Sequence, residues 1–153
     1  MSFDNVIGKN AKAYYNTATY TTPTWVEIPK IQDLSVPLSK NMVDLPSREI
    51  DWSVKGAGLK TMQVTFGYLM VSGADTVFDA LLDSFISDTP IGMAFMNGAI
   101  ATSTNQGMRA YLVASGMDED QGLEEGLSHA FTFDIVRFND SGTLRNPEWY
   151  IIS

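Results

Sequence analysis

The sequence contains no cysteine and only one histidine among its 153 residues. The absence of cysteine excludes structural disulfides and thiolate chemistry, and it points weakly to a reducing compartment. A single histidine excludes metal sites rich in imidazole. No run reaches the roughly 18 apolar residues that a membrane-spanning helix needs. Met1 to Asn10 also lack the basic head and apolar stretch of a secretory signal.

Basic residues are scarce as well: 10 Lys and Arg stand against 18 Asp and Glu, which gives a formal net charge of −8. Affinity for nucleic acid comes mainly from Lys and Arg on phosphates, so this chain is a poor candidate for binding it. It can still lie beside DNA without holding it. Hydrophobic residues make up 44% of the chain, which excludes a disordered composition, and the length suits one domain with a sizeable core.

The polar residues do not assemble into a catalytic or metal-binding arrangement. There is no nucleophile elbow and no convincing Ser-His-Asp order. His129 alternates with Phe131 and Phe133, and a lone histidine on a strand is more often structural than catalytic. The acidic stretch from Asp118 to Glu125 fails the EF-hand spacing, because Gly122 and His129 occupy ligand positions. We therefore expect no active site, no cofactor and no metal, and we do not expect an enzyme.

Two consecutive segments, 48–55 and 61–70, alternate between apolar and polar residues. The apolar residues are Ile50, Trp52, Val54, Met62, Val64, Phe66, Tyr68 and Met70. Period two indicates strands, because successive side chains point to opposite faces. Gly56-Ala57-Gly58 separates the segments, so they are expected to form a long β-hairpin with one apolar and one polar face.

Burying the apolar rows together fixes the register of that hairpin. Val54 is expected opposite Met62 and Trp52 opposite Val64, both inward, because a one-residue slip would mix the two faces. The polar face then collects Glu49, Asp51, Ser53, Lys55, Thr61, Gln63 and Thr65, together with Gly67. This neutral to acidic surface is either simply exposed to solvent or the wall of a water-filled channel. If another strand pair lines such a channel instead, we expect it around Thr132 and Asp134.

Residues 30–46 form the least regular stretch, with Pro37 and Pro46 among apolar residues that follow no clean helical period. A loop of about 15 residues seldom stays in a compact monomer without a function or a partner, and an apolar loop is normally covered. We expect a long loop between subunits, in which Leu38, Met42, Val43 and Leu45 pack on a neighbour. The alternative is a strand-containing connection that packs on its own domain.

Both ends of the chain carry apolar residues outside the periodic segments. Residues 1–10 are expected to form an N-terminal arm anchored by Phe3, Val6 and Ile7, or else a frayed terminus. Residues 139–153 form a C-terminal tail that contains Trp149 and Tyr150. Apolar ends normally dock on something, so these residues are further candidates for contacts between subunits.

The remaining pattern predicts one helix among short strands. The helix is expected at about 75–87, where the apolar residues fall on one stripe, and Ser72 with Asp75 resembles a capping box. Strands are expected at 11–15, 25–28, 91–96, 107–115 and 127–138, with an Asn97-Gly98 hairpin turn and an acidic loop over 117–127. This order predicts a mostly antiparallel β domain with one helix covering the sheet.

The order of landmarks resembles the tail tube proteins of long-tailed bacteriophages. The landmarks are Trp25-Val26-Glu27-Ile28-Pro29, Ile31-Gln32-Asp33-Leu34-Ser35-Val36-Pro37-Leu38, Asp44, Arg48, Trp52, the strand and helix from Leu59 to Phe85, Met96-Asn97-Gly98, the Gly107 strand, and Pro147-Glu148-Trp149. Leu45-Pro46-Ser47-Arg48 is longer than the corresponding family stretch. The resemblance spans nearly the whole chain and depends on order and spacing rather than on one specific motif.

The resemblance implies one tail-tube domain over residues 1–153, an antiparallel β-sandwich or half-barrel with a flanking helix. It further implies homohexameric rings that stack into a tube of the virion, assembled in the host cytoplasm. DNA would pass through the lumen without specific binding, and the partners would be further copies, a tape-measure protein, and terminator and tip proteins, with no membrane. Tubes of contractile injection systems and type VI secretion are similar. An unrelated β-sandwich binding module, such as a carbohydrate binder, stays open, and it should be monomeric with an aromatic platform.

Overall fold

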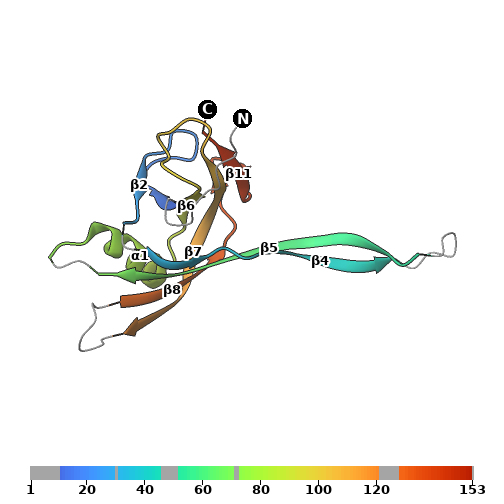
Figure 1. Cartoon of the computed structure of the whole chain (residues 1–153), viewed down its shortest axis with the longest axis horizontal. Coiled ribbons are helices and arrows are strands. Elements are labelled where there is room, and N and C mark those ends of the chain that lie inside the picture. Colours follow the sequence, from blue (N-terminus) through green and yellow to red (C-terminus); the bar gives the residue numbers. More distant parts are fainter. Residues whose placement is uncertain (1–10, 30, 46–51, 71–72, 121–127, 153) are drawn as a thin grey trace, which may run out of the picture.

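The computed structural model describes residues 11–29, 31–45, 52–70, 73–120 and 128–152. These ranges contain eleven strands and one helix (Figure 1). The elements are β1 (Lys12–Asn16), β2 (Trp25–Glu27), β3 (Ile31–Ser35), β4 (Leu38–Leu45), β5 (Val54–Leu69), α1 (Thr76–Ser87), β6 (Ile91–Met96), β7 (Gln106–Asp120), β8 (Ser128–Ile135), β9 (Asn139–Asp140), β10 (Thr143–Leu144) and β11 (Glu148–Ile151). The residues expected to form an N-terminal arm, 1–10, lie outside the described ranges.

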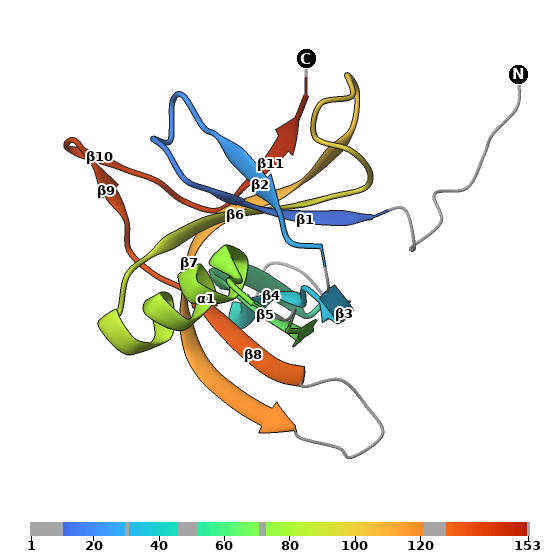
Figure 2. The same ribbon diagram turned by 90° about the vertical axis from the view of Figure 1, so that its left-hand side faces the viewer.

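Nine strands form one antiparallel sheet in the order β2-β1-β6-β7-β8-β5-β3, with β11 beside β7 and β4 beside β5. The long strand β7 joins two layers, because its first half pairs with β6 and β11 and its second half pairs with β8. Figure 2 shows β1, β2 and β6 above β3, β5 and β8, with α1 beside the opening between the layers. This curved sheet with one helix confirms the fold class expected from the sequence.

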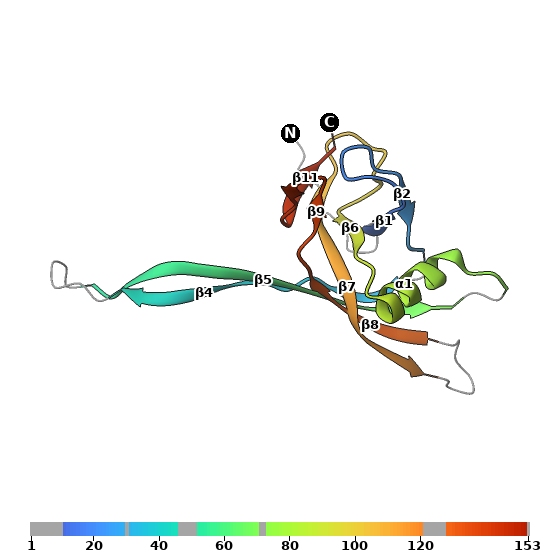
Figure 3. The same cartoon turned by 180° about the vertical axis from the view of Figure 1, so that it is seen from behind.

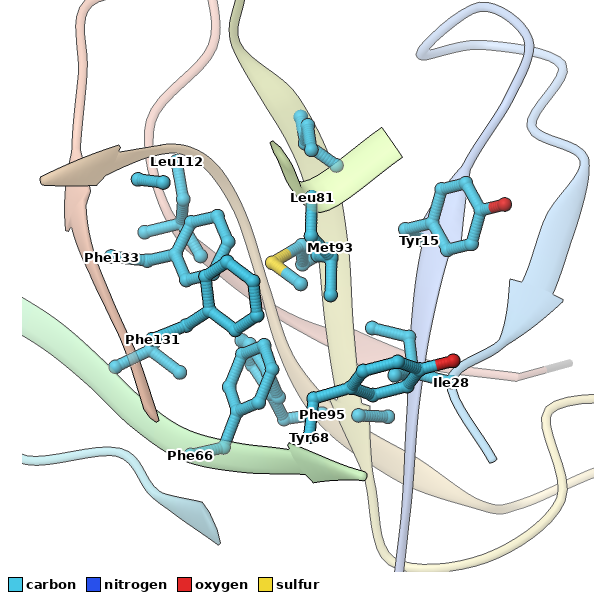
Figure 4. Close-up of a cluster of buried hydrophobic side chains, with 14 of the residues drawn as sticks. Tyr15, Ile28, Phe66, Tyr68, Leu81, Met93, Phe95, Leu112, Phe131 and Phe133 are labelled. Carbon is cyan, nitrogen blue, oxygen red and sulfur yellow. The ribbon is translucent and has the colours of Figure 1, made fainter. Parts of the chain in front are cut away.

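The core lies between the two layers and α1 (Figure 4). In β5 the expected alternation is confirmed, because Met62, Val64, Phe66 and Tyr68 are all buried. The ladder with β8 places Phe66 opposite Phe131 and Val64 opposite Phe133. Figure 4 shows Phe66, Phe131 and Phe133 pointing toward Leu81 of α1 and Met93 of β6. Burying one such side chain contributes roughly 1.5–3 kcal/mol, so this cluster holds the layers together.

The expected helix is confirmed, with a correction to its cap. Asp75 is itself the N-cap, and its Oδ1 accepts from the Phe78 amide at 3.0 Å. The same buried carboxylate accepts from the Tyr68 hydroxyl at 3.0 Å and 2.9 Å. Burial and the Asp75 carboxylate raise the pKa of Tyr68. One acidic side chain therefore fixes both the start of α1 and its position on β5. Ser72 lies outside the described residues.

The predicted hairpin of 48–55 with 61–70 is wrong. β5 runs unbroken from Val54 to Leu69, and its partner is β4, with Leu38 opposite Met62 and Leu45 opposite Val54. The glycines at 56 and 58 lie within the strand instead of forming a turn. Alternation identified the strand correctly but carries no information on which segment pairs with it. Trp52, expected inward, is 82% exposed, because no strand or helix of the described ranges covers that end of the hairpin.

Three further expectations need correction. The loop predicted over residues 30–46 consists of strands β3 and β4 in its described part, 31–45. The Asn97-Gly98 turn is a longer connection that spans 97–105 and is closed by the Asn97 amide on the Gln106 carbonyl at 2.9 Å. The acidic loop begins later than predicted, because β7 continues to Asp120 along β8; its residues 121–127 lie outside the described ranges.

Candidate assembly surfaces

The hairpin of β4 with residues 54–61 of β5, here called the arm, projects away from the rest of the molecule (Figures 1 and 3). All eight residues of β4 are exposed. Leu38, Met42, Val43 and Leu45 each expose between 51% and 55% of their surface, and Leu59 exposes 81%. A two-stranded hairpin alone is at best marginally stable in water. The arm therefore carries apolar surface that nothing in the described part of the same chain covers.

A β-bulge divides the arm into two parts. Lys40 lies opposite Lys60 and Met42 opposite Ala57, so one residue of β4 faces two of β5, Gly58 and Leu59. A Cβ atom at Gly58 would lie 2.8 Å from the Asn41 carbonyl oxygen, and glycine permits this close approach. An extra residue shifts the alternation by one. The distal part of β5 thus presents its odd-numbered residues where the proximal part presents its even-numbered ones.

The register defines two faces of the arm, since directly opposed residues share a face. The lysine face comprises Leu38, Met62, Lys40, Lys60, Met42, Ala57, Asp44 and Lys55, and the valine face comprises Ser39, Thr61, Val43, Gly56, Leu45 and Val54. On the valine face the Ser39 and Thr61 hydroxyls lie 2.5 Å apart. The expectation that Lys55 shares a face with Thr61 is wrong, because the bulge places it on the lysine face.

The body of the sheet has a polar surface opposite the core, here called the open face. Cross-strand pairing brings Gln63 beside Asp134 and Thr65 beside Thr132, and the Gln63 amide donates to the Asp134 carboxylate at 3.2 Å. The two strand pairs that the sequence offered as alternatives are thus one surface. Thr61 and Gln63 are exposed and Thr65 is half-buried; Ser53 is exposed, while Glu49 and Asp51 lie outside the described residues. The open face contains acidic, amide, hydroxyl and small side chains, two aliphatic residues, Leu69 and Val113, and no described aromatic ring.

The C-terminal tail forms an edge strand, β11, along the first half of β7. Trp149 is 57% exposed, and its indole donates to the Gln106 side chain at 2.8 Å. Tyr150 packs against a small second cluster formed by Tyr14, Ala94 and Met96. Packing within its own chain accounts for the partial burial of Tyr150. A contact of Trp149 or Tyr150 with another subunit stays a prediction.

A buried arginine ties the tail to the N-terminal strands. The Arg109 guanidinium lies 3.8 Å from the Tyr20 ring centroid and about 5 Å from those of Trp25 (5.1 Å) and Tyr150 (5.2 Å). It also donates to the Tyr20 carbonyl at 2.6 Å, and the Tyr20 hydroxyl donates to the Glu148 carboxylate. Burial, helped by Glu148, raises the pKa of Tyr20 to about 12. Sequence analysis missed this cluster, because its members are distant in the chain and follow no local pattern.

His129 occupies a structural position. It is 4% exposed, its ring lies 4.6 Å from that of Phe78, and its Nε2 lies 3.8 Å from a Glu119 carboxylate oxygen. Within the described ranges, no group of three or more His, Asp or Glu residues is placed to hold a metal ion. Among the same residues, no helix has the length and apolar character needed to cross a membrane.

A groove of about 840 Å³ lies at the root of the arm. One side is the arm itself, with Lys40, Leu59 and Lys60, and the other side is the body, with Met108, Ile135 and Pro147. Its lining is mostly apolar, and the two lysines belong to it. The groove is therefore a second surface, beside the arm, that combines an apolar lining with two positive charges.

Comparison with known proteins identifies the fold. No protein-family model matches the chain, and no curated protein matches it either. The solved structures that match nearly all of it include the SPP1 tail tube (12% identity, 94% of this chain and 80% of that chain, TM-score 0.69), the tail of a gene transfer agent particle refined with C6 symmetry (14%, 92% and 97%, TM-score 0.65), and the sheath–tube complex of the extracellular contractile injection system PVC (9%, 97% and 93%, TM-score 0.64).

At these identities the similarity is one of fold. It extends over more than nine-tenths of this chain in each case. The resemblance stated from the sequence is thereby confirmed at the level of architecture. The chain has the fold found in tail tubes and in the tubes of contractile injection systems.

Proposed function

We propose that this protein is a structural subunit of a viral tail tube, in which copies form rings and the rings stack into a hollow tube. The observation that carries the proposal is the arm: an extended hairpin with exposed apolar side chains that nothing in the described part of the same chain covers. The tail-tube fold supplies the context. Hexameric rings are the proposed symmetry, since one similar tail was refined with C6 symmetry. The proposal assigns the protein no catalytic role.

The arm is the proposed contact between subunits. Leu38, Met42, Val43 and Leu45 are exposed in the single chain, and burying them against a neighbour would remove this apolar surface from water. Phe3, Val6 and Ile7 in the N-terminal segment and Trp149 and Tyr150 in the tail are proposed as further contacts. A tape-measure protein inside the tube, and terminator and tip proteins at its ends, are the other partners proposed.

The open face is the proposed wall of the lumen. Among its described residues, the charged side chains Asp118 and Asp134 are acidic, so repetition around a ring would produce a mildly negative wall. DNA would meet weak repulsion and no aromatic platform on which bases stack, which favours transit over binding. The absence of an aromatic ring among the described residues of this face also argues against a carbohydrate-binding module.

Negative-stain microscopy of the purified protein, before and after concentration, tests the tube proposal. We expect rings or tubes from the wild type. Changing Met42→Asp and Val43→Asp together should block assembly and leave a folded monomer, because charge would be buried unpaired at the contact. The control Thr102→Asp with Ser103→Asp adds the same charge on an exposed connection and should still assemble. A wild type that stays monomeric at high concentration would refute the proposal.

The lumen assignment has its own test. Gln63→Lys with Thr132→Lys should leave assembly intact and make the interior basic, so that DNA passage slows in a salt-dependent manner. Ser103→Lys serves as the control outside the open face. If the double lysine variant fails to assemble while the control assembles, the open face lies between subunits, and another surface lines the channel.

A further inference from the structure

We infer that the groove at the root of the arm receives helix α1 of a second copy, so that Lys40 and Lys60 of one subunit face Asp79 and Asp83 of the next. The inference rests on the proposed tube function and names the surfaces that meet when rings stack. Two independent features carry it: an unbalanced pair of lysines on one side of the molecule, and an acidic, partly apolar helix stripe on the other.

The lysine pair is unfavourable in the isolated chain. Lys40 and Lys60 are directly opposed in the ladder, and both are exposed. Like charges in directly opposed positions destabilise a hairpin. No ion pair found among the described residues includes either lysine, and Asp44, the acidic residue of the same face, is opposed to Lys55. An acidic surface of another molecule would relieve this repulsion.

The groove adds an apolar requirement. Leu38 and Leu59 of the arm and Met62, Met108 and Ile135 of the body line the space that the two lysines border. A partner that fills it must place apolar side chains on this lining and carboxylates next to the lysines. A plain acidic tail or a plain apolar strand would satisfy only one of the two conditions.

Helix α1 meets both conditions. Asp79, Asp83 and Ile86 follow spacings of four and three residues, which align them on one stripe of the helix. All three are exposed, Ile86 to 69%, and the neighbouring Phe85 is 38% exposed. The last turn of α1 contains no basic residue. The stripe thus combines two carboxylates with one exposed apolar side chain, Ile86, at the helix end.

The two surfaces lie on opposite sides of the molecule. Figures 1 and 3 show the arm projecting to one side of the body and α1 lying toward the other. Figure 2, which looks onto the side opposite the arm, shows α1 in front of the sheet. A contact between different surfaces of successive copies propagates into an open stack. Since the whole chain carries a net charge of −8, the local basic-to-acidic contact would also orient the approach of two copies that otherwise repel.

Charge reversal with rescue tests the inference. Lys40→Glu with Lys60→Glu should raise the critical concentration for tube assembly roughly tenfold or more, since two attractive contacts become repulsive. The monomer should hardly change in stability, because one like-charge pair replaces another. Asp79→Lys with Asp83→Lys should cause a similar defect. Combining all four changes should restore assembly to within about threefold of the wild type. Thermal unfolding of each variant checks that the monomer is folded.

A matched control uses the other acidic surface. Asp118→Lys with Asp134→Lys, on the open face, changes charge by the same amount and should not rescue the lysine-reversed arm. Rescue by this pair instead of the α1 pair would overturn the inference, because the arm would then face the open face of its neighbour.

Crosslinking provides a second, independent readout. Because the native chain has no cysteine, Lys60→Cys with Asp83→Cys should form disulfide-linked ladders in assembled tubes, and Lys60→Cys with Ser103→Cys should not. If the wild type forms tubes but the combined charge reversal does not restore assembly and no ladders form, the α1 contact is refuted while the tube proposal stands. Failure of the wild type to assemble would refute the tube proposal itself.

Discussion

The two halves of β5 lie in opposite surroundings, although they are one continuous strand. From Met62 to Tyr68 alternate side chains are buried against β8 and the helix, whereas from Val54 to Thr61 no side chain is fully buried. Both halves contain large apolar residues. Apolar content therefore does not distinguish a strand that stabilises the monomer from one that is exposed for contact with another molecule. The two are distinguished by whether other elements of the same chain cover the strand.

The difference separates stability from assembly. Changes in the body should alter the free energy of unfolding, because contacts there form within the chain. Changes in the arm should leave that quantity almost unchanged and act on association.

The largest effect is expected in the aromatic core. Phe133 is fully buried and stacks on Phe66 with ring centroids 5.5 Å apart. Phe133→Ala should reduce the free energy of unfolding by about 3–5 kcal/mol, because it opens a cavity. Val43→Ala in the arm should change it by less than about 0.5 kcal/mol. Urea unfolding of both variants measures the two values, and equal losses would mean that the arm is packed in the monomer.

Two glycines provide a second comparison. A Cβ at Gly107 would lie 1.8 Å from the Phe95 carbonyl oxygen, and one at Gly58 would lie 2.8 Å from that of Asn41. Gly107→Ala should cost about 3 kcal/mol or more, since β6 and β7 are held on both sides. Gly58→Ala should cost less than about 1 kcal/mol in the monomer, because the two-stranded arm can shift. Thermal unfolding distinguishes the two, and a Gly107→Ala protein of unchanged stability would refute the close approach of these strands.

The helix cap should produce a medium effect. Asp75→Ala removes the acceptor for the Phe78 amide and leaves the buried Tyr68 hydroxyl without this carboxylate. A loss of about 1–3 kcal/mol is expected from the missing cap and hydrogen bonds. Ser39→Ala, which removes an exposed hydroxyl contact in the arm, should change stability by less than about 0.5 kcal/mol. Chemical unfolding of the two variants tests the difference.

The smallest effect concerns alkaline pH, and it comes from a tyrosine in the body. The folded state raises the pKa of Tyr20 from its ordinary value of 10 to about 12. A raised pKa of this kind means that the stabilisation is complete below pH 10 and is lost as the pH rises toward 12. Tyr20→Phe should therefore weaken the fall in stability between these values. Tyrosinate absorbance should also lose one late-titrating group, and an unchanged titration curve would contradict the assignment.

The sequence predicted an element correctly where the pattern of apolar residues within that element shows which side of it is buried. The buried stripe of α1 and the alternation of 61–70 both follow from a single core on one side, so the helix and the body half of β5 were predictable. Partner strands were not. Leu38 to Leu45 show no alternation because neither face of the arm is buried, and for that reason the sequence predicts a loop there. The bulge at Gly58 and Leu59 reversed the face of Lys55, which no count of alternating residues could reveal.

The candidate surfaces differ in the same way: those that follow a local sequence pattern were predictable, and those that depend on distant residues were not. The sequence predicts that one face of β5 is polar, and Thr61, Gln63 and Thr65 do lie on it. The part of the same face that belongs to β8 is predicted only as an alternative. The exposed apolar residues of the arm were identified because they fitted no periodic element. The Arg109 cluster and the groove depend on residues distant in the sequence, and only the folded chain brings them together.

The continuity of β5 has a mechanical consequence. A pull on the arm along its length would act along the axis of the same strand that lies between β3 and β8 in the body. The ladder from Gln63 to Leu69 pairs with β8 through hydrogen bonds that run across the strand. A tensile load would therefore shear all of these bonds together instead of peeling them one after another. If such arms join successive rings, each subunit would resist stretching of the tube through a strand whose body half is part of the hydrophobic core.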